Sequence, residues 1–261
     1  MPVDQKPKIT PEFIRAAKSR GERVAALTAY DYPTARLLDE AGVPLILVGD
    51  SVGMVVLGYP DTTQVTLAEM RHHVAAVARA KTKALVVGDL PYHTYQTAPN
   101  AVANAHILTE AGAEAIKLEG GVAVVPEIRA LREAGIAVMG HIGMLPQHLK
   151  EEGGYKIKGR SEEQKVQVMA DALAVEEAGA FAVVLELVEP ELAREITAKL
   201  SIPTIGIGSG AHCFGNILVT HDLIGAFPWF RPKFAVATVD VASAIRGAAE
   251  GYVRQVKEGG G

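Results

Sequence analysis

The sequence has 261 residues, of which 49% are hydrophobic and 21% charged, and its formal net charge is −4. It contains no basic stripe and no apolar run near the roughly 20 residues of a membrane helix, which excludes the usual signatures of nucleic-acid binding and membrane spanning. The first ten residues lack the apolar core of a secretory signal, and the one cysteine, Cys213, excludes an internal disulfide. We therefore expect a cytoplasmic protein whose residues 1–261 form a single domain.

Short apolar runs recur along the chain, separated by segments with helical composition. A first helix is predicted at residues 11–19, where it would cover the bottom of the following sheet. Eight strands are predicted from runs that are apolar at consecutive positions, as in parallel strands buried on both faces. They lie at residues 24–30, 45–51, 84–90, 115–120, 137–143, 181–187, 204–210 and 217–222. Helices rich in Ala, Glu, Leu and Val are predicted between them, at residues 66–80, 99–111, 122–134 and 161–178.

The phrase Glu-Ala-Gly repeats at four predicted helix ends, beginning at residues 40, 110, 133 and 177. Glycine suits the left-handed position that terminates a helix, and a strand follows within a few residues each time. Eight such units predict a closed (β/α)8 barrel. Because only six residues separate Gly210 from Ile217, we expect at most one short turn in place of the seventh helix. Residues 228–238 are predicted to form a loop before a C-terminal helix at 239–257.

Polar residues end almost every predicted strand. In a (β/α)8 barrel the carboxyl ends of the strands and the loops after them build the active site. One such residue alone is often a solvated or capping group, whereas a full ring of them predicts catalysis. The ring consists of Asp50, Ser51, Asp89, Lys117, Glu119, His141, Glu186, Ser209, His221 and Asp222.

Asp50 and Asp89 each end an apolar strand in the sequence Val-Gly-Asp. Two carboxylates, completed by water or substrate oxygens, suit Mg²⁺, which seldom takes an all-protein cage. The alternative is that each aspartate caps the turn that follows it. Zinc is disfavoured because the sequence contains no cluster of His and Cys residues with the spacing of zinc ligands.

Glu186 lies at an apolar strand end, where desolvation would raise its pKa toward neutrality and suit a general base. A solvated rim position, or pairing with Lys117, is the alternative. Lys117 and His141 are candidates for binding an anionic group such as a carboxylate, and their alternative is a salt bridge to Glu119 or Glu186. The glycine-rich run at 206–210 resembles a phosphate loop without the dinucleotide spacing, and close packing explains it equally well.

From about Leu27 to Asp222 the chain resembles the ketopantoate hydroxymethyltransferase family. The matching segments include LILVGDSVGMVVLGYPDTTQVTLAEM, VVGDLPYHTYQ, KLEGG, VMGHIGMLPQ, GGYKIKGR and IGIGSG. The resemblance implies a barrel of the phosphoenolpyruvate/pyruvate type, a requirement for Mg²⁺ and a homodecamer built as a pentamer of dimers. The implied reaction transfers a hydroxymethyl group from 5,10-methylenetetrahydrofolate to 3-methyl-2-oxobutanoate, giving 2-dehydropantoate, the first committed step of pantothenate biosynthesis.

The resemblance also implies roles for individual residues. Asp50 and Asp89 would ligate Mg²⁺, and Glu119 would hold a metal-bound water. Glu186 would remove the C3 proton of the keto acid, giving an enolate stabilised by Mg²⁺ that attacks the one-carbon unit of the folate. The keto acid would be bound by Asp50, Ser51, Asp89, Lys117 and His141.

Four positions depart from the family pattern. Phe214 and Asn216 stand where the family usually has Asp and Gln, Lys158 where it often has Gln, and Thr238 where Tyr is common. None is a proposed metal ligand or base. The change at Phe214 is expected to alter hydrogen bonding in the loop after strand seven, with effects on folate contacts or subunit packing.

Two other functions compete with the transferase. The first is a Mg²⁺-dependent 2-oxo acid lyase or mutase of the isocitrate lyase type, which commonly carries a cysteine motif in a mobile loop. Here the only cysteine, Cys213, lies near strand seven instead. The second is a barrel that only binds or scaffolds, which does not account for the retention of every proposed site residue.

Overall fold

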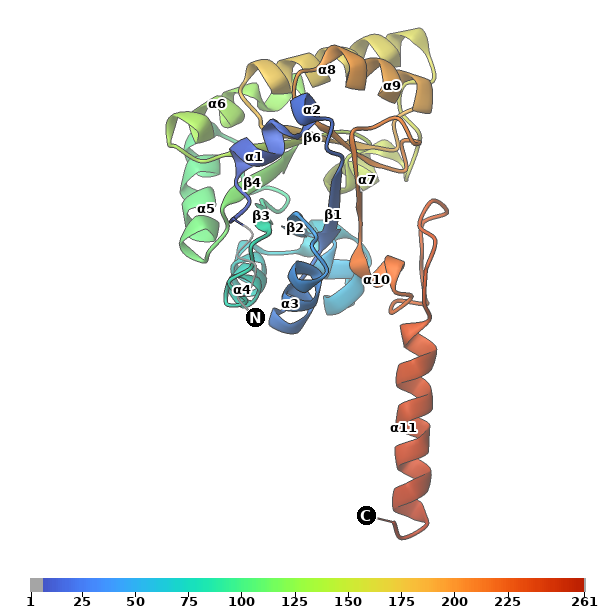
Figure 1. The fold of residues 1–261 in the computed structure, drawn as a ribbon. Helices are drawn as coiled ribbons and strands as arrows, with labels where there is room; N and C mark the ends of the chain where they lie inside the picture. Colours follow the sequence, from blue (N-terminus) through green and yellow to red (C-terminus); the bar gives the residue numbers. More distant parts are fainter. Residues whose placement is uncertain (1–6, 261) are drawn as a thin grey trace. The chain divides into compact units, whose positions relative to one another are not determined.

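The computed structural model describes residues 7–260, so both ends of the predicted domain, at residues 1–6 and 261, lie outside the described residues. Eight parallel strands close into a barrel in chain order (Figure 1). They are β1 (Val24–Thr28), β2 (Leu45–Val48), β3 (Leu85–Asp89), β4 (Ala115–Glu119), β5 (Val138–Gly143), β6 (Ala182–Glu186), β7 (Thr204–Ile207) and β8 (Gly215–Leu218). The predicted (β/α)8 barrel is confirmed.

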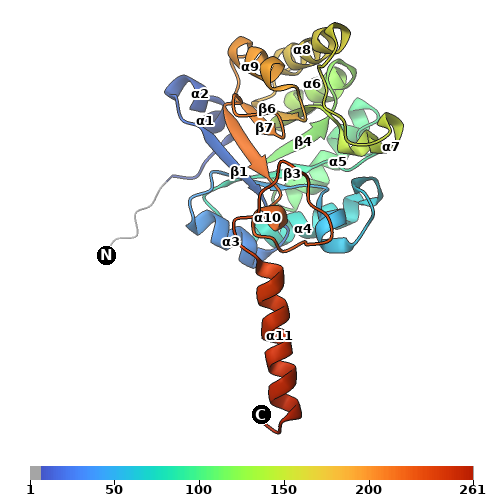
Figure 2. The ribbon, with the colours of Figure 1, turned by 90° about the vertical axis from the view of Figure 1, so that its right-hand side faces the viewer.

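Helices surround the strands (Figure 2). The larger ones are α3 (Tyr32–Glu40), α4 (Leu67–Ala78), α5 (Ala98–Glu110), α6 (Val125–Glu133), α8 (Glu162–Glu177) and α9 (Pro190–Lys199). Shorter turns are η1 (Gly53–Leu57), η2 (Thr62–Gln64), η3 (Val122–Val124), η4 (Pro146–His148) and α7 (Leu149–Glu152). The helix predicted at 122–134 therefore begins as the separate turn η3.

The helix ends follow from local sequence. Thr66 begins α4 with a capping box in which its side chain accepts from Glu69 N–H and the Glu69 carboxylate accepts from Thr66 N–H. The glycines of the four Glu-Ala-Gly phrases all have positive φ, from +78° at Gly135 to +112° at Gly112, which confirms their predicted left-handed conformation.

The predicted N-terminal helix is two short helices, α1 (Pro11–Arg15) and α2 (Ala17–Arg20), interrupted at Ala16. At the break, the Arg20 guanidinium folds back over the Phe13 ring and donates to the Phe13 carbonyl at 3.1 Å. Ile14 and Ala17 are buried in the same apolar cluster as the residues inside the barrel. The expectation that this segment covers the barrel bottom is thus confirmed.

Strand alternation creates two apolar layers. Leu45, Leu85 and Met139 belong to the cluster inside the barrel. Their chain neighbours, such as Ile46 and Val86, point outward and pack against the helices. The barrel interior below the site is therefore filled with side chains and forms a packed core.

The seventh crossover and the eighth strand differ from the prediction. Residues 208–214 form bends without a helix, and β8 begins at Gly215, two residues before the predicted start. A Cβ atom at Gly215 would lie 2.3 Å from the Val24 carbonyl oxygen, so glycine lets this strand approach β1 closely. The strand ends at Leu218, and His221 and Asp222 belong to the short helix α10 (Thr220–Leu223).

The described chain divides into two compact units, with the boundary between Ile217 and Leu218. The second unit contains α10, the irregular segment predicted at 228–238, and α11 (Val241–Lys257), whose first turn is capped by the Asp240 side chain. A single domain remains a prediction. Within residues 7–260, none of the helices combines the length and apolar character that crossing a bilayer requires.

Candidate active site

Strand alternation directs five predicted site residues into the barrel. Asp89 follows the interior residue Val87 by two positions, and Glu186 follows Val184 in the same way. Because side chains alternate across a strand, both face the interior. The same spacing applies to Lys117, Glu119 and His141, and all five are buried, with exposed fractions of 1% to 8%.

A chain of charged contacts joins these residues across the barrel. Lys117 Nζ lies 2.8 Å from both carboxylate oxygens of Asp89 and 3.4 Å from Glu119 Oε1. His141 Nδ1 lies 3.2 Å from Glu119 Oε1, and its Nε2 lies 3.2 Å from Glu186 Oε2. The distances fit ion pairs, although both contacts fall outside hydrogen-bond angles. The salt bridges considered as an alternative for Lys117 and His141 are therefore present.

The charges in this chain of contacts reinforce one another. Burial acts to lower the pKa of His141, but the charge of Glu119 outweighs it and the pKa rises to about 9. Burial likewise acts against ionisation of Glu119, yet Lys117 and His141 lower its pKa to about 2. The pKa of Lys117 is raised, because Asp89 and Glu119 overcome its desolvation. At neutral pH the site holds an imidazolium and an ammonium.

Asp50 lies just beyond β2, and its main-chain N–H donates to Asp89 Oδ2 at 3.2 Å. Its side chain is 5% exposed. Burial, followed by the negative charge of Asp89, raises the pKa of Asp50 well above its ordinary value. Burial also raises the pKa of Asp89, against the opposing effect of Lys117. The two predicted metal ligands are therefore neighbours that repel each other, an arrangement that a cation would relieve.

Gln147 is a buried neighbour of these carboxylates that sequence reasoning missed. Its Nε2 donates to Asp50 Oδ2 at 2.9 Å, and its main-chain N–H donates to Glu119 Oε2 at 3.1 Å. It lies in η4, directly after β5. Its only signal in the sequence was its place in the family-like segment VMGHIGMLPQ, since a neutral amide in a turn has no periodicity to mark it.

The two predicted serines differ in setting. Ser51 adjoins Asp50 and shares a 2.8 Å hydrogen bond with the Tyr30 hydroxyl. Ser209 is buried, where its hydroxyl donates to the Leu185 carbonyl at 2.7 Å and accepts from Val188 N–H at 2.9 Å. Ser209 therefore ties the end of β7 to that of β6. His221 and Asp222 lie in α10, which belongs to the second unit.

The glycine-rich run at 206–210 is closely packed. A Cβ atom at Gly206 would lie 2.8 Å from Cys213 Sγ, and one at Gly210 would lie 2.9 Å from Pro190 Cβ. Of the two interpretations, close packing thus has direct support. Cys213 itself is 1% exposed and belongs to the apolar core, which is unlike the mobile-loop cysteine expected for a lyase.

The departures from the family pattern have local effects. Phe214 packs against the barrel interior, and its N–H donates to Thr204 Oγ1 at 3.1 Å. Asn216 is exposed. Lys158 Nζ pairs with Glu152 Oε2 at 2.7 Å, which joins the two ends of the segment 152–158. In the second unit, the Thr238 hydroxyl donates to the Leu223 carbonyl at 3.1 Å.

The residues at this barrel end fit a divalent cation. Four buried carboxyl groups, at positions 50, 89, 119 and 186, outnumber the two cationic groups Lys117 and His141. No three His, Cys, Asp or Glu side chains among residues 7–260 form a ready-made metal cage. An ion held by two aspartates would complete its coordination with water or substrate oxygens, as Mg²⁺ commonly does.

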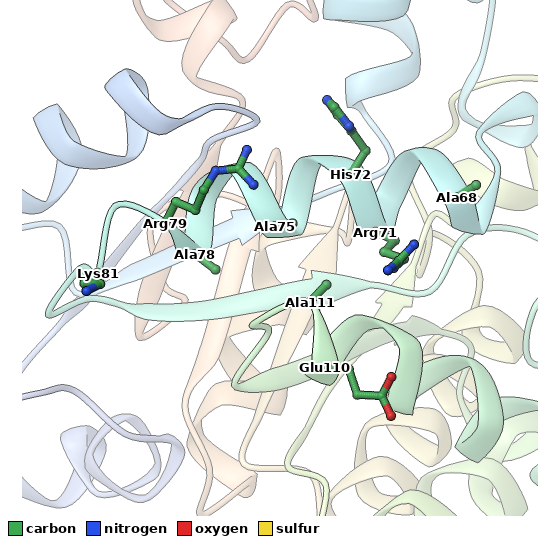
Figure 3. Close-up of a pocket in the computed structure, with 9 residues that line it drawn as sticks. All are labelled: Ala68, Arg71, His72, Ala75, Ala78, Arg79, Lys81, Glu110 and Ala111. Atoms are coloured by element: carbon green, nitrogen blue, oxygen red, sulfur yellow. The ribbon is translucent and has the colours of Figure 1, made fainter.

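A hollow of about 760 Å³ lies on the outer surface between α4 and α5 (Figure 3). Alanine side chains and basic groups surround it, and none of the predicted site residues reaches it. Its lining consists of Ala68, Arg71, His72, Ala75, Ala78, Arg79, Lys81, Glu110 and Ala111.

Solved structures with similar folds include a phosphonopyruvate hydrolase in complex with oxalate and Mg²⁺, with a TM-score of 0.67, 17% identity and coverage of 98% of this chain and 89% of that chain. A 2,3-dimethylmalate lyase, described as a member of the PEP mutase/isocitrate lyase superfamily, has a TM-score of 0.62, 18% identity and coverage of 97% and 90%. At these identities the likeness shows the fold alone.

Sequence relatives are much more similar. A protein from Moorella thermoacetica named 3-methyl-2-oxobutanoate hydroxymethyltransferase is 53% identical over 98% of this chain and 96% of its own length. A protein of the same name from Caldivirga maquilingensis is 55% identical, with coverage of 96% and 94%. The family model described as ketopantoate hydroxymethyltransferase matches residues 8–260. The resemblance expected from the motifs is thus confirmed, and the chain belongs to the ketopantoate hydroxymethyltransferase family.

Proposed function

We propose that this chain transfers a hydroxymethyl group from 5,10-methylenetetrahydrofolate to 3-methyl-2-oxobutanoate, giving 2-dehydropantoate and tetrahydrofolate with the consumption of one water. The C–H bond at C3 and the two C–N bonds of the methylene bridge break, and a C–C bond to the one-carbon unit forms. Water supplies the hydroxyl group, and its other proton and the proton from C3 end on the two folate nitrogens. Family membership supports this reaction. The lyase or mutase alternative has only the shared fold in its favour.

The observation that carries the proposal is the unbroken chain of buried contacts from Glu186 to Asp50. It runs through His141, Glu119, Lys117 and Asp89, with successive contacts of 2.8 to 3.4 Å. A proposed base and two proposed metal ligands therefore belong to one barrel interior. A keto acid held there would present its carboxylate to cationic groups and its C3–H bond to a carboxylate.

Glu186 would take the C3 proton, with the His141 side chain adjacent to its carboxylate at 3.2 Å. Lys117 and His141 would offset the charge of the substrate carboxylate, while Ser51 would donate a hydrogen bond. Asp50 and Asp89 would hold Mg²⁺, with Glu119 binding one of its waters. When bound, Mg²⁺ would supply Lewis-acid polarisation of the 2-oxo group.

The test is product formation from 3-methyl-2-oxobutanoate and 5,10-methylenetetrahydrofolate, with Mg²⁺ and with a chelator in its place. We expect 2-dehydropantoate only with the metal. Folded protein that binds Mg²⁺ and keto acid without turnover would contradict the transferase function.

The homodecamer and the cytoplasmic location are part of the same proposal. Light scattering on protein eluted from a size-exclusion column should give ten times the mass of one chain. A smaller assembly that retains full activity would contradict the decamer without affecting the reaction.

A further inference from the structure

The side chain of Gln147 has partners for both ends of its amide. Nε2 donates to Asp50 Oδ2 at 2.9 Å and to the Leu90 carbonyl at 3.0 Å, and Oε1 accepts from the Tyr95 hydroxyl at 2.5 Å. Gln147 is 1% exposed, so water does not compete for these groups. With every amide group engaged, the side chain has one satisfied orientation.

Tyr95 determines that orientation. Its side chain is 8% exposed, and burial together with the charges of Glu119 and Asp89 raises its pKa, which keeps the phenol protonated as a donor. A donating hydroxyl requires the oxygen of the Gln147 amide on its side. The amide nitrogen must then face Asp50.

The neighbouring carboxylates differ in how they are held. Both carboxylate oxygens of Asp89 accept hydrogen bonds from Lys117 Nζ. Among residues 7–260, the Asp50 carboxylate accepts one side-chain hydrogen bond, which comes from Gln147. Removing Gln147 would therefore free the Asp50 carboxylate to rotate while leaving Asp89 in place. The Gln147 main-chain bond to Glu119 would persist after a side-chain substitution, because it comes from the backbone of η4.

We propose that Gln147, oriented by Tyr95, is a positioning residue that holds Oδ2 of Asp50 so that the carboxylate is preset for a divalent cation. The inference rests on the proposed function for the identity of that cation. It adds that metal affinity depends on a neutral relay, Tyr95 to Gln147 to Asp50, whose two outer members lie on different barrel loops. Hydrogen bonds of this kind orient metal ligands, and their loss commonly weakens metal binding 10- to 100-fold.

The test measures Mg²⁺ affinity by titration calorimetry, without substrates, for Gln147→Met, Tyr95→Phe and the double variant. Methionine keeps the length of the side chain and removes the amide. We expect about 10- to 100-fold weaker binding for Gln147→Met and a smaller loss for Tyr95→Phe. In the Gln147→Met background, Tyr95→Phe should change the affinity by less than about twofold, because its effect passes through the amide.

The matched controls come from the same loop as Tyr95. Tyr92→Phe removes a hydroxyl that donates to the exposed Glu151, and Gln96→Met removes an exposed amide. Both should bind Mg²⁺ like the parent protein. The thermal shift produced by Mg²⁺ should shrink for Gln147→Met and persist in the controls.

Parent-like Mg²⁺ affinity in folded Gln147→Met would overturn the inference, as would equal effects of Tyr95→Phe with and without the amide. Should Gln147→Met fail to fold, Tyr95→Phe alone decides, since an unchanged affinity there removes the relay. If the parent binds Mg²⁺ but does not form product, the proposed function fails while the relay is still tested. A parent that binds no Mg²⁺ overturns the relay as well.

Discussion

Nε2 of His141 lies 3.2 Å from Oε2 of Glu186, and the two side chains come from neighbouring strands, β5 and β6. The apolar strand end expected from the sequence is therefore only part of the surroundings of Glu186, because a cation also faces it. The contact places a cationic group beside the proposed base before substrate arrives. It also gives the proton taken from C3 a defined acceptor.

Replacing Glu186 with Gln should separate binding from chemistry. The amide keeps the shape of the side chain but does not accept a proton, so we expect turnover to fall by about 10²- to 10⁴-fold while keto-acid affinity changes little. Exchange of the C3 proton with solvent deuterium, followed by NMR, should be lost. Glu191→Gln, at an exposed surface pair with Arg194, is the control and should exchange like the parent. Continued exchange in Glu186→Gln would mean that another group is the base.

Asp50→Asn and Asp89→Asn should both weaken Mg²⁺ binding yet affect the metal-free protein differently. Burial and the charge of Asp89 disfavour the ionised form of Asp50 and raise its pKa, so its neutralisation should leave stability unchanged or raise it. Asp89→Asn leaves Lys117 with one carboxylate, 3.4 Å away, and should cost about 3 kcal/mol of unfolding free energy. Urea unfolding in a chelator measures both. Equal losses for the two variants would contradict this assignment of charges.

His141 predicts how the stability of the metal-free protein depends on pH. Its folded pKa of about 9 lies above its ordinary value of 6.5, so the stabilisation is complete below pH 6.5 and is lost as the pH rises through 9. The shift corresponds to about 3 kcal/mol. The lowered pKa of Glu119, caused first by Lys117 and then by His141, affects stability only at acid pH and adds nothing in this range. Unfolding free energies from pH 6 to 9.5 should therefore fall in the parent. The decline should be absent in His141→Gln and unaltered in His72→Gln, which changes an exposed histidine.

The barrel and its acidic residues could be predicted because both depend on local pattern. Consecutive apolar residues indicate strands buried on both faces, and the period of two then directs Asp89, Glu119 and Glu186 to the interior. The left-handed conformation of glycine at the helix ends is a property of that residue alone, so the Glu-Ala-Gly phrases were enough to predict it.

What could not be predicted depends on contacts between distant parts of the chain. Gln147 and Asp50 are 97 positions apart in the sequence, and no local periodicity predicts the hydrogen bond between them. The early start of β8 depends on how closely Gly215 approaches Val24. The partners of His141 likewise required the register of three strands, since Glu119 and Glu186 lie on either side of β5.

Lys158 should stabilise the segment it closes. It pairs with Glu152 at partly buried positions, and its backbone also bonds to residues 187 and 189 after β6. Lys158→Gln, which restores the residue common in the family, should therefore cost about 1 kcal/mol or less. Limited proteolysis should cut residues 153–157 faster in this variant. Arg160→Gln, which alters an exposed cation just after the segment, should not change the rate, and equal rates in all three proteins would contradict a role for the pair.

Gly206 separates the two interpretations of the glycine-rich run. An alanine there would place Cβ 2.8 Å from Cys213 Sγ, so we expect Gly206→Ala to cost about 1–3 kcal/mol of unfolding free energy. Cys213→Ala removes the opposing sulfur, and in that background the cost of Gly206→Ala should be smaller because the two residues share one space. Urea unfolding of the four proteins measures this coupling. If Gly206→Ala instead leaves stability intact and abolishes binding of an anionic substrate group, the run is a binding loop rather than a packing contact.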